Sequence, residues 1–431
     1  MTDTTSMTTP EPAWTALSAP EPAPARWTPV RLALAAVVLA GAGWLAWLAW
    51  DVNITLSCWK NEWPNLAVCE EINGRTPEER VARLKERLAS NPGDNQALVA
   101  LAVYASTPGL TTEEERLDLL ARAIKAAPQH RDVLRLRVGE DLRQARWAQA
   151  LEPLRRLSQY HQDKDASAAL AELATVASAD PALQARWQDL LQQDTAWLGG
   201  VLRALPGINK TMGEAMPVVL MALQAPAGLE PRTGQFVIGQ LKKEERWIEA
   251  HAVWMHLWKR PLPLLFNGDF EQAFVAQGFD WETPGSSNDH RAGAQVDRIG
   301  RKDRGQVLRV GFNGKQVRMP VVRQHLLLPP GRYRFSGQWQ SNNLQTAKGL
   351  AWVLRCAGNQ PEQQTEFARV PGIVAKGRDW QDWRVDIEAP ASCNLGVELA
   401  LVTDAAYEAR AGLRGEVFFD KLAIQPEGAQ P

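Results

Sequence analysis

The sequence predicts a multidomain protein with a single transmembrane helix, an all-α middle region and an all-β sandwich at the C-terminus. Three observations lead to this fold class. An uncharged apolar stretch lies near the N-terminus, apolar residues then recur at helical spacing, and short alternating segments bounded by Gly, Pro and Asn follow. A length of 431 residues fits two or three domains.

The composition argues against a nucleic-acid partner. The chain has 48 basic and 49 acidic residues and a net charge of −1, whereas a nucleic-acid-binding protein normally carries a basic surplus. Its sequence contains no phosphate-binding Gly-rich loop, no G-x-S-x-G and no H-E-x-x-H. We therefore expect a protein that is not an enzyme.

The stretch Leu32–Trp50 predicts the transmembrane helix, because about 19 helical residues extend roughly 28 Å, close to the thickness of the hydrocarbon layer. Arg26 and Arg31 precede the stretch and Asp51 follows it. The positive-inside rule then places the N-terminus in the cytoplasm and the rest of the chain outside. A cleaved signal peptide is the alternative, but its apolar region would be shorter and would end at a small-residue cleavage site.

These features predict a bacterial inner-membrane protein whose bulk is periplasmic. Residues 1–29 form a disordered cytoplasmic tail, residues 30–50 the membrane helix, and residues 51–75 a disulfide-linked juxtamembrane segment. The four cysteines are Cys58, Cys69, Cys356 and Cys393. An even number in an exported region predicts two disulfides, Cys58 with Cys69 and Cys356 with Cys393, with free buried thiols as the alternative. Neither pair has the spacing of metal ligands.

Residues 76–260 show helical patterning. Thr76-Pro77-Glu78-Glu79 combines a capping box with Pro at the first helical position, and Asn91-Pro92-Gly93 ends that helix. Gly199-Gly200 is expected to end another. Trp247, Trp254 and Trp258 are interpreted as the core face of a helix that packs on its neighbours.

Part of this region resembles the tetratricopeptide repeat. Pro128 follows Pro92 by 36 residues, Ala123 and Pro128 match the end of one unit, and Ala150 and Leu154 match the next. Residues 131–141 lack the expected Gly and Tyr, so the resemblance is partial. It implies stacked helix pairs whose concave surface suits a protein partner.

Residues 261–427 alternate like β-strands. Tyr333, Phe335 and Trp339 share one face of a strand. Cys356 and Cys393 fall on apolar faces of two other strands, which permits a bridge only if those strands are neighbours.

Three segments resemble carbohydrate-binding jelly-roll modules of the galactose-binding-like type. They are Leu265–Glu271, Pro330–Gly337 and Gly415–Leu422, in the order that such modules have. The resemblance covers about residues 262–426 and implies a jelly-roll sandwich. Its bearing on the ligand is weaker, because the fold also serves adhesion and structural roles.

The resemblance implies two sites. In such modules a calcium ion often joins the first strand to the last, and Asp269, Glu271 and Asp420 are the matching oxygen donors, with turn or strand capping as the alternative. A sugar site would need an exposed aromatic plane beside hydrogen-bonding groups. The candidates are Trp380, Arg334, Gln338, Gln340 and Arg355. Core packing is the alternative role for Trp380.

Together these features predict a membrane-anchored periplasmic scaffold or binding protein. The helical repeats would bind protein and the jelly roll would bind glycan, in a setting such as assembly or export of a cell-surface polysaccharide. One alternative is an envelope glycan hydrolase or lyase with an appended binding module. Another is a purely structural assembly scaffold. No cofactor is expected apart from a structural calcium ion.

Overall fold

The computed structural model describes residues 29–59, 69, 74–259, 262–275, 277–284, 293–358, 364–374 and 379–428. It divides into two compact units, one up to Leu119 and one from Leu120 onwards. The boundary falls within helix α5 (Glu113–Ala126). The predicted disordered tail, residues 1–29, lies outside the described part except for its last residue.

The first unit contains helices only among its described residues. They are α1 (Pro29–Trp59), α3 (Pro77–Ser90), α4 (Asn95–Ala105) and the start of α5. The predicted capping box at the start of α3 is confirmed. The Glu79 amide donates to Thr76 Oγ1 over 3.2 Å, and the Thr76 amide donates to the Glu79 carboxylate over 3.4 Å. These bonds satisfy two amides that the helix itself leaves without acceptors.

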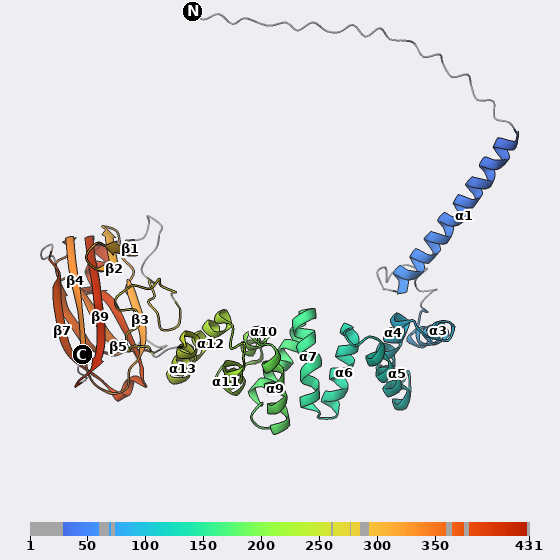
Figure 1. The fold of residues 1–431 in the computed structure, drawn as a ribbon, viewed down its shortest axis with the longest axis horizontal. Coiled ribbons are helices and arrows are strands. Elements are labelled where there is room, and N and C mark those ends of the chain that lie inside the picture. Colours follow the sequence, from blue (N-terminus) through green and yellow to red (C-terminus); the bar gives the residue numbers. More distant parts are fainter. Residues whose placement is uncertain are drawn as a thin grey trace, which may run out of the picture. The chain divides into compact units, whose positions relative to one another are not determined.

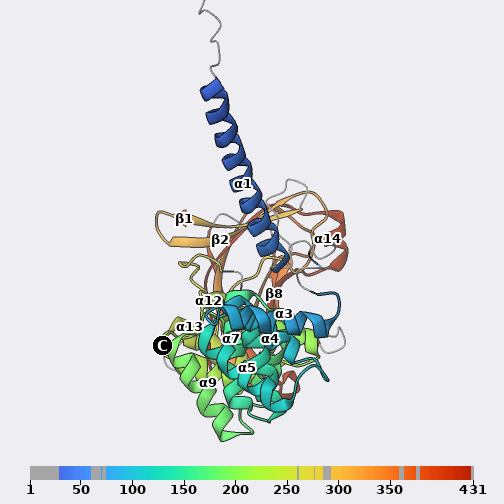
Figure 2. The same cartoon turned by 90° about the vertical axis from the view of Figure 1, so that its right-hand side faces the viewer.

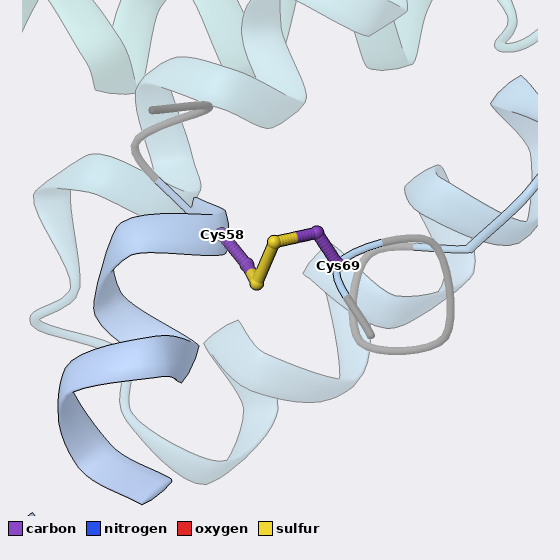
Figure 3. Close-up of a disulfide and its surroundings, with 2 residues drawn as sticks. All are labelled: Cys58 and Cys69. Carbon is purple, nitrogen blue, oxygen red and sulfur yellow. A yellow bond between two sulfur atoms is a disulfide. The ribbon is translucent and has the colours of Figure 1, made fainter. Parts of the chain in front are cut away.

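The predicted membrane segment Leu32–Trp50 lies inside α1, although the side chains of its first five residues are outside the described part. In the helices as far as the structure describes them, none is both long and apolar enough to cross a membrane. The predicted disulfide between Cys58, on α1, and Cys69 is confirmed (Figure 3). Both cysteines are buried.

The second unit begins with a succession of helices (Figure 1). They are α6 (Arg131–Arg143), α7 (Trp147–His161), α8 (Lys164–Thr175), α9 (Pro181–Gln193), α10 (Leu198–Ala204), η1 (Leu205–Ile208), α11 (Met216–Gln224), α12 (Pro231–Lys243) and α13 (Trp247–Trp258). Among them, α7 packs on α6, α8 and α9, and α12 packs on α13. One core runs through them, and it includes a stacked pair formed by Trp187 and Trp197. Stacked helix pairs are present, while the tetratricopeptide identity of these pairs stays a prediction.

The expectation that Gly199-Gly200 ends a helix is wrong, because both residues lie inside α10. A Cβ atom at Gly199 would lie 2.5 Å from Thr233 Oγ1 on α12. Glycine at this position therefore allows two helices to approach closely, which is a packing role and not a stop signal.

The C-terminal part of the second unit is a sandwich of two antiparallel sheets. The strands are β1 (Ala294–Arg301), β2 (Gly305–Asn313), β3 (Val322–Leu327), β4 (Gly331–Gln345), β5 (Leu350–Cys356), β6 (Glu366–Ile373), β7 (Gln381–Ala389), β8 (Gly396–Thr403) and β9 (Arg414–Pro426). Two short helices, η3 (Ala391–Cys393) and α14 (Ala406–Ala411), connect strands. The five-stranded sheet has the order β1-β2-β9-β4-β7, and the four-stranded sheet has the order β3-β8-β5-β6.

Strands β2 to β9 have jelly-roll order, because β2-β9-β4-β7 face β3-β8-β5-β6. The hairpin of β1 and β2 adds one strand at the edge (Figure 2). The jelly-roll sandwich expected from the resemblance is therefore confirmed by strand order.

The sandwich core is formed by the inward faces predicted from alternation. Phe335 of β4, Trp352 of β5 and Phe419 of β9 are fully buried. The predicted bridge between Cys356 and Cys393 is also confirmed, with the two Cα atoms 4.6 Å apart. Cys393 lies on η3, just before β8, and not on a strand as alternation predicted. The bridge therefore ties the end of β5 to η3 and closes one end of the core.

Helix α13 packs on the outer face of the four-stranded sheet. Trp247 stacks on His325 of β3 with ring centres 5.6 Å apart, and a Cβ atom at Gly396 of β8 would lie 2.2 Å from the Trp247 ring. Trp254 contacts Phe266 and Phe279, which belong to the segment leading into the sandwich. The core role expected for these tryptophans is confirmed, and their partners include the sandwich as well as other helices.

Candidate functional site

The outer face of the five-stranded sheet carries a row of polar side chains. Gln338 and Gln340 lie on β4, facing away from the buried Phe335, as alternation predicts. Gln338 is opposite Asp382 of β7, and its Nε2 atom donates to Asp382 Oδ1 over 2.7 Å. Since α13 covers the outer face of the other sheet, the glutamine row lies on the sheet farther from the helices (Figure 1).

The side chain of Arg304 connects four elements of this face. It lies in the turn between β1 and β2, and its guanidinium donates to Gln338 Oε1 and, over 3.3 Å, to Asp420 Oδ2 of β9. The guanidinium carbon is 4.2 Å from the ring centre of Trp380, which precedes β7. One side chain thus links the hairpin, β9, β4 and the start of β7 through hydrogen bonds and a cation–π contact.

Arg301, at the end of β1, makes contacts similar to those of Arg304. Its guanidinium carbon lies 4.4 Å from the ring centre of Phe418 on β9, and Nη2 donates to Gln340 Oε1 over 3.3 Å. Phe418 is only 4% exposed although it lies on the outer side of the sheet. The two arginines therefore lie flat across the face and cover its aromatic residues.

A third arginine on this face is neutralised. Arg309 of β2 contacts Glu416 of β9 at 2.6 Å and Asp297 of β1 at 2.9 Å. Burial tends to raise the pKa of Glu416, but hydrogen bonds from Arg309 and Asn342 outweigh it and hold this pKa below its ordinary value. Glu416 is therefore a stable anion whose charge is already matched.

Asp420 lies beneath Arg304 and is 2% exposed. Burial raises the pKa of this carboxyl above its ordinary value, although the Lys421 amide and Arg304 donate to it and oppose the shift. Desolvation therefore dominates here. The carboxyl acts as an internal acceptor that fixes Arg304.

The structure brings together three of the five predicted sugar-binding residues, namely Trp380, Gln338 and Gln340. Arg334 lies farther along β4 and pairs with Asp386 over 2.9 Å in an exposed ion pair. Arg355 is on β5 of the other sheet, where it makes two bonds to Glu398. Grouping Arg355 with the others was therefore wrong, because alternation assigns a face within one strand but not the sheet to which the strand belongs.

Sequence reasoning missed Arg301 and Arg304. They belong to a hairpin turn, and Arg304 reaches a carboxylate 116 residues away in the chain. A turn sequence predicts the hairpin, but only strand order reveals which side chains it faces. The local sequence therefore contains no signal that would identify Arg301 or Arg304 as site residues.

The predicted calcium donors do not form a cluster. Glu271 accepts from the Gln306 amide over 2.9 Å, and Asp269 accepts from the Glu271 amide over 3.5 Å. Asp420 is held by Arg304, whose positive charge disfavours a cation beside it. Across the described part of the chain, no group of three or more His, Cys, Asp or Glu side chains could hold a metal ion.

A separate pocket of about 520 Å³ lies at the edge of the sandwich. It is lined by Pro263, residues 265–269 and Gln272, and by residues 421–425 at the end of β9. Asp269 is among its lining residues, but none of the predicted sugar-binding side chains is. The polar face described above is therefore the candidate site in which the predicted groups meet.

No protein family matches the chain, and no curated protein does. A solved CBM4 module shows 14% sequence identity, covers 38% of this chain and 99% of its own, and has a TM-score of 0.29. A putative sugar-binding protein from Bacteroides thetaiotaomicron shows 11% identity over 38% of this chain and 100% of its own, with a TM-score of 0.29. The CBM22-1 xylan-binding domain of Paenibacillus barcinonensis Xyn10C shows 13% identity over 38% and 94%, with a TM-score of 0.25. These sequence identities and TM-scores are too low to carry an argument, so the jelly-roll assignment rests on strand order.

Proposed function

We propose that this protein binds a glycan on the outer face of the five-stranded sheet and does not turn it over. The observation that carries the proposal is the cluster around Arg304, which fixes Gln338, Asp420 and Trp380 on the uncovered face of a jelly roll. A preformed set of polar groups beside an aromatic edge is the kind of surface that orients sugar hydroxyls.

The chemistry of the face suits hydroxyl recognition. A glutamine amide both donates and accepts, as a sugar hydroxyl does, and each guanidinium offers five N–H donors. Gln338 and Gln340 are held by hydrogen bonds from Arg304 and Arg301, so little side-chain entropy is lost when a ligand binds. Trp380 is partly exposed, so its rim is available to a sugar ring.

The test is glycan binding by the full-length protein on a broad panel. Replacing both glutamines, Gln338→Ala with Gln340→Ala, should weaken binding at least about tenfold, since several hydrogen bonds of roughly 1 kcal/mol each are lost. The matched control is Gln188→Ala with Gln192→Ala on α9, where both side chains are exposed. If the unaltered protein binds nothing on the panel, the proposal is wrong, and measured turnover of any glycan would favour the hydrolase alternative.

A structural role is the second candidate, and the junction of α13 with the sandwich favours it. Phe266 and Phe279 belong to the same buried cluster as the helices, so the sandwich is joined to the helical row by a common core. We propose that the helices dock a protein partner and present the sandwich. Co-purification that requires the helices but not the glutamine pair would support this division of labour.

We also propose that the protein acts in the bacterial cell envelope, in assembly or export of a surface polysaccharide. Two disulfides support an oxidising compartment. Exposed apolar side chains on α1, among them Leu39, Trp44 and Trp47, support attachment to a membrane. The test is a reporter active only outside the cytoplasm, fused after Gln425, with retention in carbonate-washed membranes. Soluble full-length protein would contradict the attachment.

A further inference from the structure

We infer that the glycan is anionic and that Arg301 receives its carboxylate. This inference rests on the proposed function, namely that the outer face of the five-stranded sheet binds a glycan. It adds the chemical class of the sugar and the residue that reads it.

The first step is the charge balance of three arginines at the β1–β2 end of the face, Arg301, Arg304 and Arg309. Arg309 has two carboxylate partners, Glu416 and Asp297, and Arg304 has Asp420 beneath it. Arg301 forms no ion pair with any side chain in the described ranges. Its one hydrogen bond there goes to the neutral amide of Gln340. Of these three cations, only Arg301 forms no ion pair within the described part, although its charge helps to lower the pKa of Glu416.

The second step is desolvation. The Nε atom of Arg301 is buried and has no hydrogen-bond partner among the described residues. A guanidinium packed against a ring loses water from one side, and a buried N–H without an acceptor costs free energy. An incoming carboxylate would supply the missing charge at the Nη edge of the planar guanidinium.

The third step is preorganisation. The ring of Phe418, 4.4 Å from the Arg301 guanidinium carbon, and the hydrogen bond to Gln340 fix the plane of the group. Arg301 Nη1 makes no hydrogen bond within the part of the chain that the structure describes. A fixed plane with a free donor edge favours a planar oxyanion over a single hydroxyl.

The fourth step concerns the aromatic surfaces. Neutral polysaccharides are commonly held by stacking of sugar rings on aromatic planes. Here Arg301 covers Phe418, and Arg304 lies 4.2 Å from the ring centre of Trp380. The face therefore offers charge and hydrogen bonds in place of open stacking planes.

Three carboxylates on the same face already accept hydrogen bonds. Glu416 accepts from Arg309 and Asn342, and Asp420 is buried under Arg304. Asp382 accepts from Gln338 Nε2, on the β7 side of the face. The ligand's carboxylate is therefore placed at the β1 end, near Arg301, and its hydroxyls toward Gln338.

The experiment compares oligogalacturonate with the same oligosaccharide after reduction of its carboxyl groups, using the full-length protein. The unaltered protein should bind the acidic form at least about tenfold more tightly, and rising salt should weaken only that form. Arg301→Gln should remove the preference, so that the acidic and reduced forms bind with similar affinity. Arg334→Gln, an exposed arginine on the same face paired with Asp386, is the matched control and should retain the preference.

Arg301→Lys separates charge from shape. It keeps the cation and loses the planar fork, so the preference should fall between those of the unaltered protein and Arg301→Gln. Equal binding of the two forms by the unaltered protein overturns the inference and leaves glycan binding intact. Binding of neither form, nor of any other glycan on the panel, overturns the proposed function itself. Thermal unfolding of each variant shows that it is folded.

Discussion

The two outer faces of the sandwich carry similar side chains in different environments. On the four-stranded sheet, Lys242 of α12 contacts Glu282 at 3.4 Å, Arg323 contacts Glu282 at 2.6 Å, and Arg355 contacts Glu398 at 2.6 Å. Helix α13 packs beside them through Trp247. On the five-stranded sheet no helix packs over the arginines, as far as the structure describes the chain, and one of these arginines has no carboxylate partner there.

This difference shows which charged side chains indicate a functional site. A charge removed from water is tolerated when a partner is close, because the Coulomb attraction then offsets desolvation. The junction beside α13 meets this requirement, so its many charges indicate docking of the sandwich on the helices. An unmatched cation such as Arg301 persists where solvent or a ligand can reach it. A functional face is therefore identified better by charge mismatch than by charge number.

The largest effect on stability is predicted at the junction between α13 and the sandwich. Trp254→Ala should lower the free energy of unfolding by about 3–5 kcal/mol, because a fully buried ring between α13 and the sandwich is lost. The measurement is urea unfolding of the full-length protein. Trp147→Ala on α7, where the ring is 42% exposed, is the control and should cost less than about 1 kcal/mol. Equal small effects would show that the sandwich does not depend on the helices.

The disulfide of the sandwich gives the second prediction. Cys356→Ser together with Cys393→Ser should reduce stability by about 2–4 kcal/mol, since the bridge closes a loop of 37 residues in the unfolded chain. Unfolding with and without reductant measures the effect, and reductant should no longer matter in the variant. The glycan affinity should stay the same, because the bridge lies at the end of β5 in the other sheet. Loss of binding in the folded variant would mean that the two faces are coupled.

The third prediction uses pH to probe the junction. Burial first, and Lys242 second, lower the pKa of His325, while Glu282 and Glu398 oppose the shift. Arg323 faces the same cluster. Folded His325 therefore stays neutral at pH values where unfolded histidine binds a proton. The unfolded state then gains protons, so stability should fall as pH drops below about 6.5, by at most about 1.4 kcal/mol per pH unit.

His325→Gln should flatten this part of the pH profile, and His256→Gln, exposed on α13, is the control that should preserve it. A second decline is expected at lower pH. Burial alone would raise the pKa of Glu282, but His325, 3.6 Å from its carboxylate, and the charge of Lys242 hold this pKa well below its ordinary value. Its contribution is present above its unfolded pKa of about 4.5 and is lost as pH falls below that value. A profile unchanged by His325→Gln would contradict this assignment.

Much of the fold could be predicted from local sequence. The capping box at Thr76 depends on residues three positions apart, and the faces of β4 depend on alternation within one strand. The disulfide pairing followed from an even count and spacing. The capping box and the strand faces need only local geometry, whereas the bridge between Cys356 and Cys393 also needs segments 37 residues apart to become neighbours.

The candidate site could be predicted only in part, since it depends on which strands become neighbours. Gln338, Gln340 and Trp380 could be listed, yet Arg304 joins them from a turn, and Arg355 belongs to the other sheet. The calcium donors follow the order of the resembling modules, but Asp420 forms an ion pair with Arg304, which no local sequence signal indicated. Gly199 shows the same limit within the helices, because its packing partner lies on α12.

The smallest effect on stability is expected at Trp380 on the five-stranded sheet. It is a tryptophan, as is Trp254, where the largest effect is expected. Trp380→Ala removes a partly exposed ring and its contact with Arg304, which together contribute about 1 kcal/mol. Urea unfolding should therefore change little, whereas glycan affinity should fall at least about tenfold, because Arg304 loses the ring that orients it toward Gln338. The two tryptophans thus have different roles: Trp254 contributes mainly to stability, and Trp380 contributes mainly to binding. If Trp380→Ala instead destabilises the protein as strongly as Trp254→Ala, this ring belongs to the core, and the contrast between the two faces is lost.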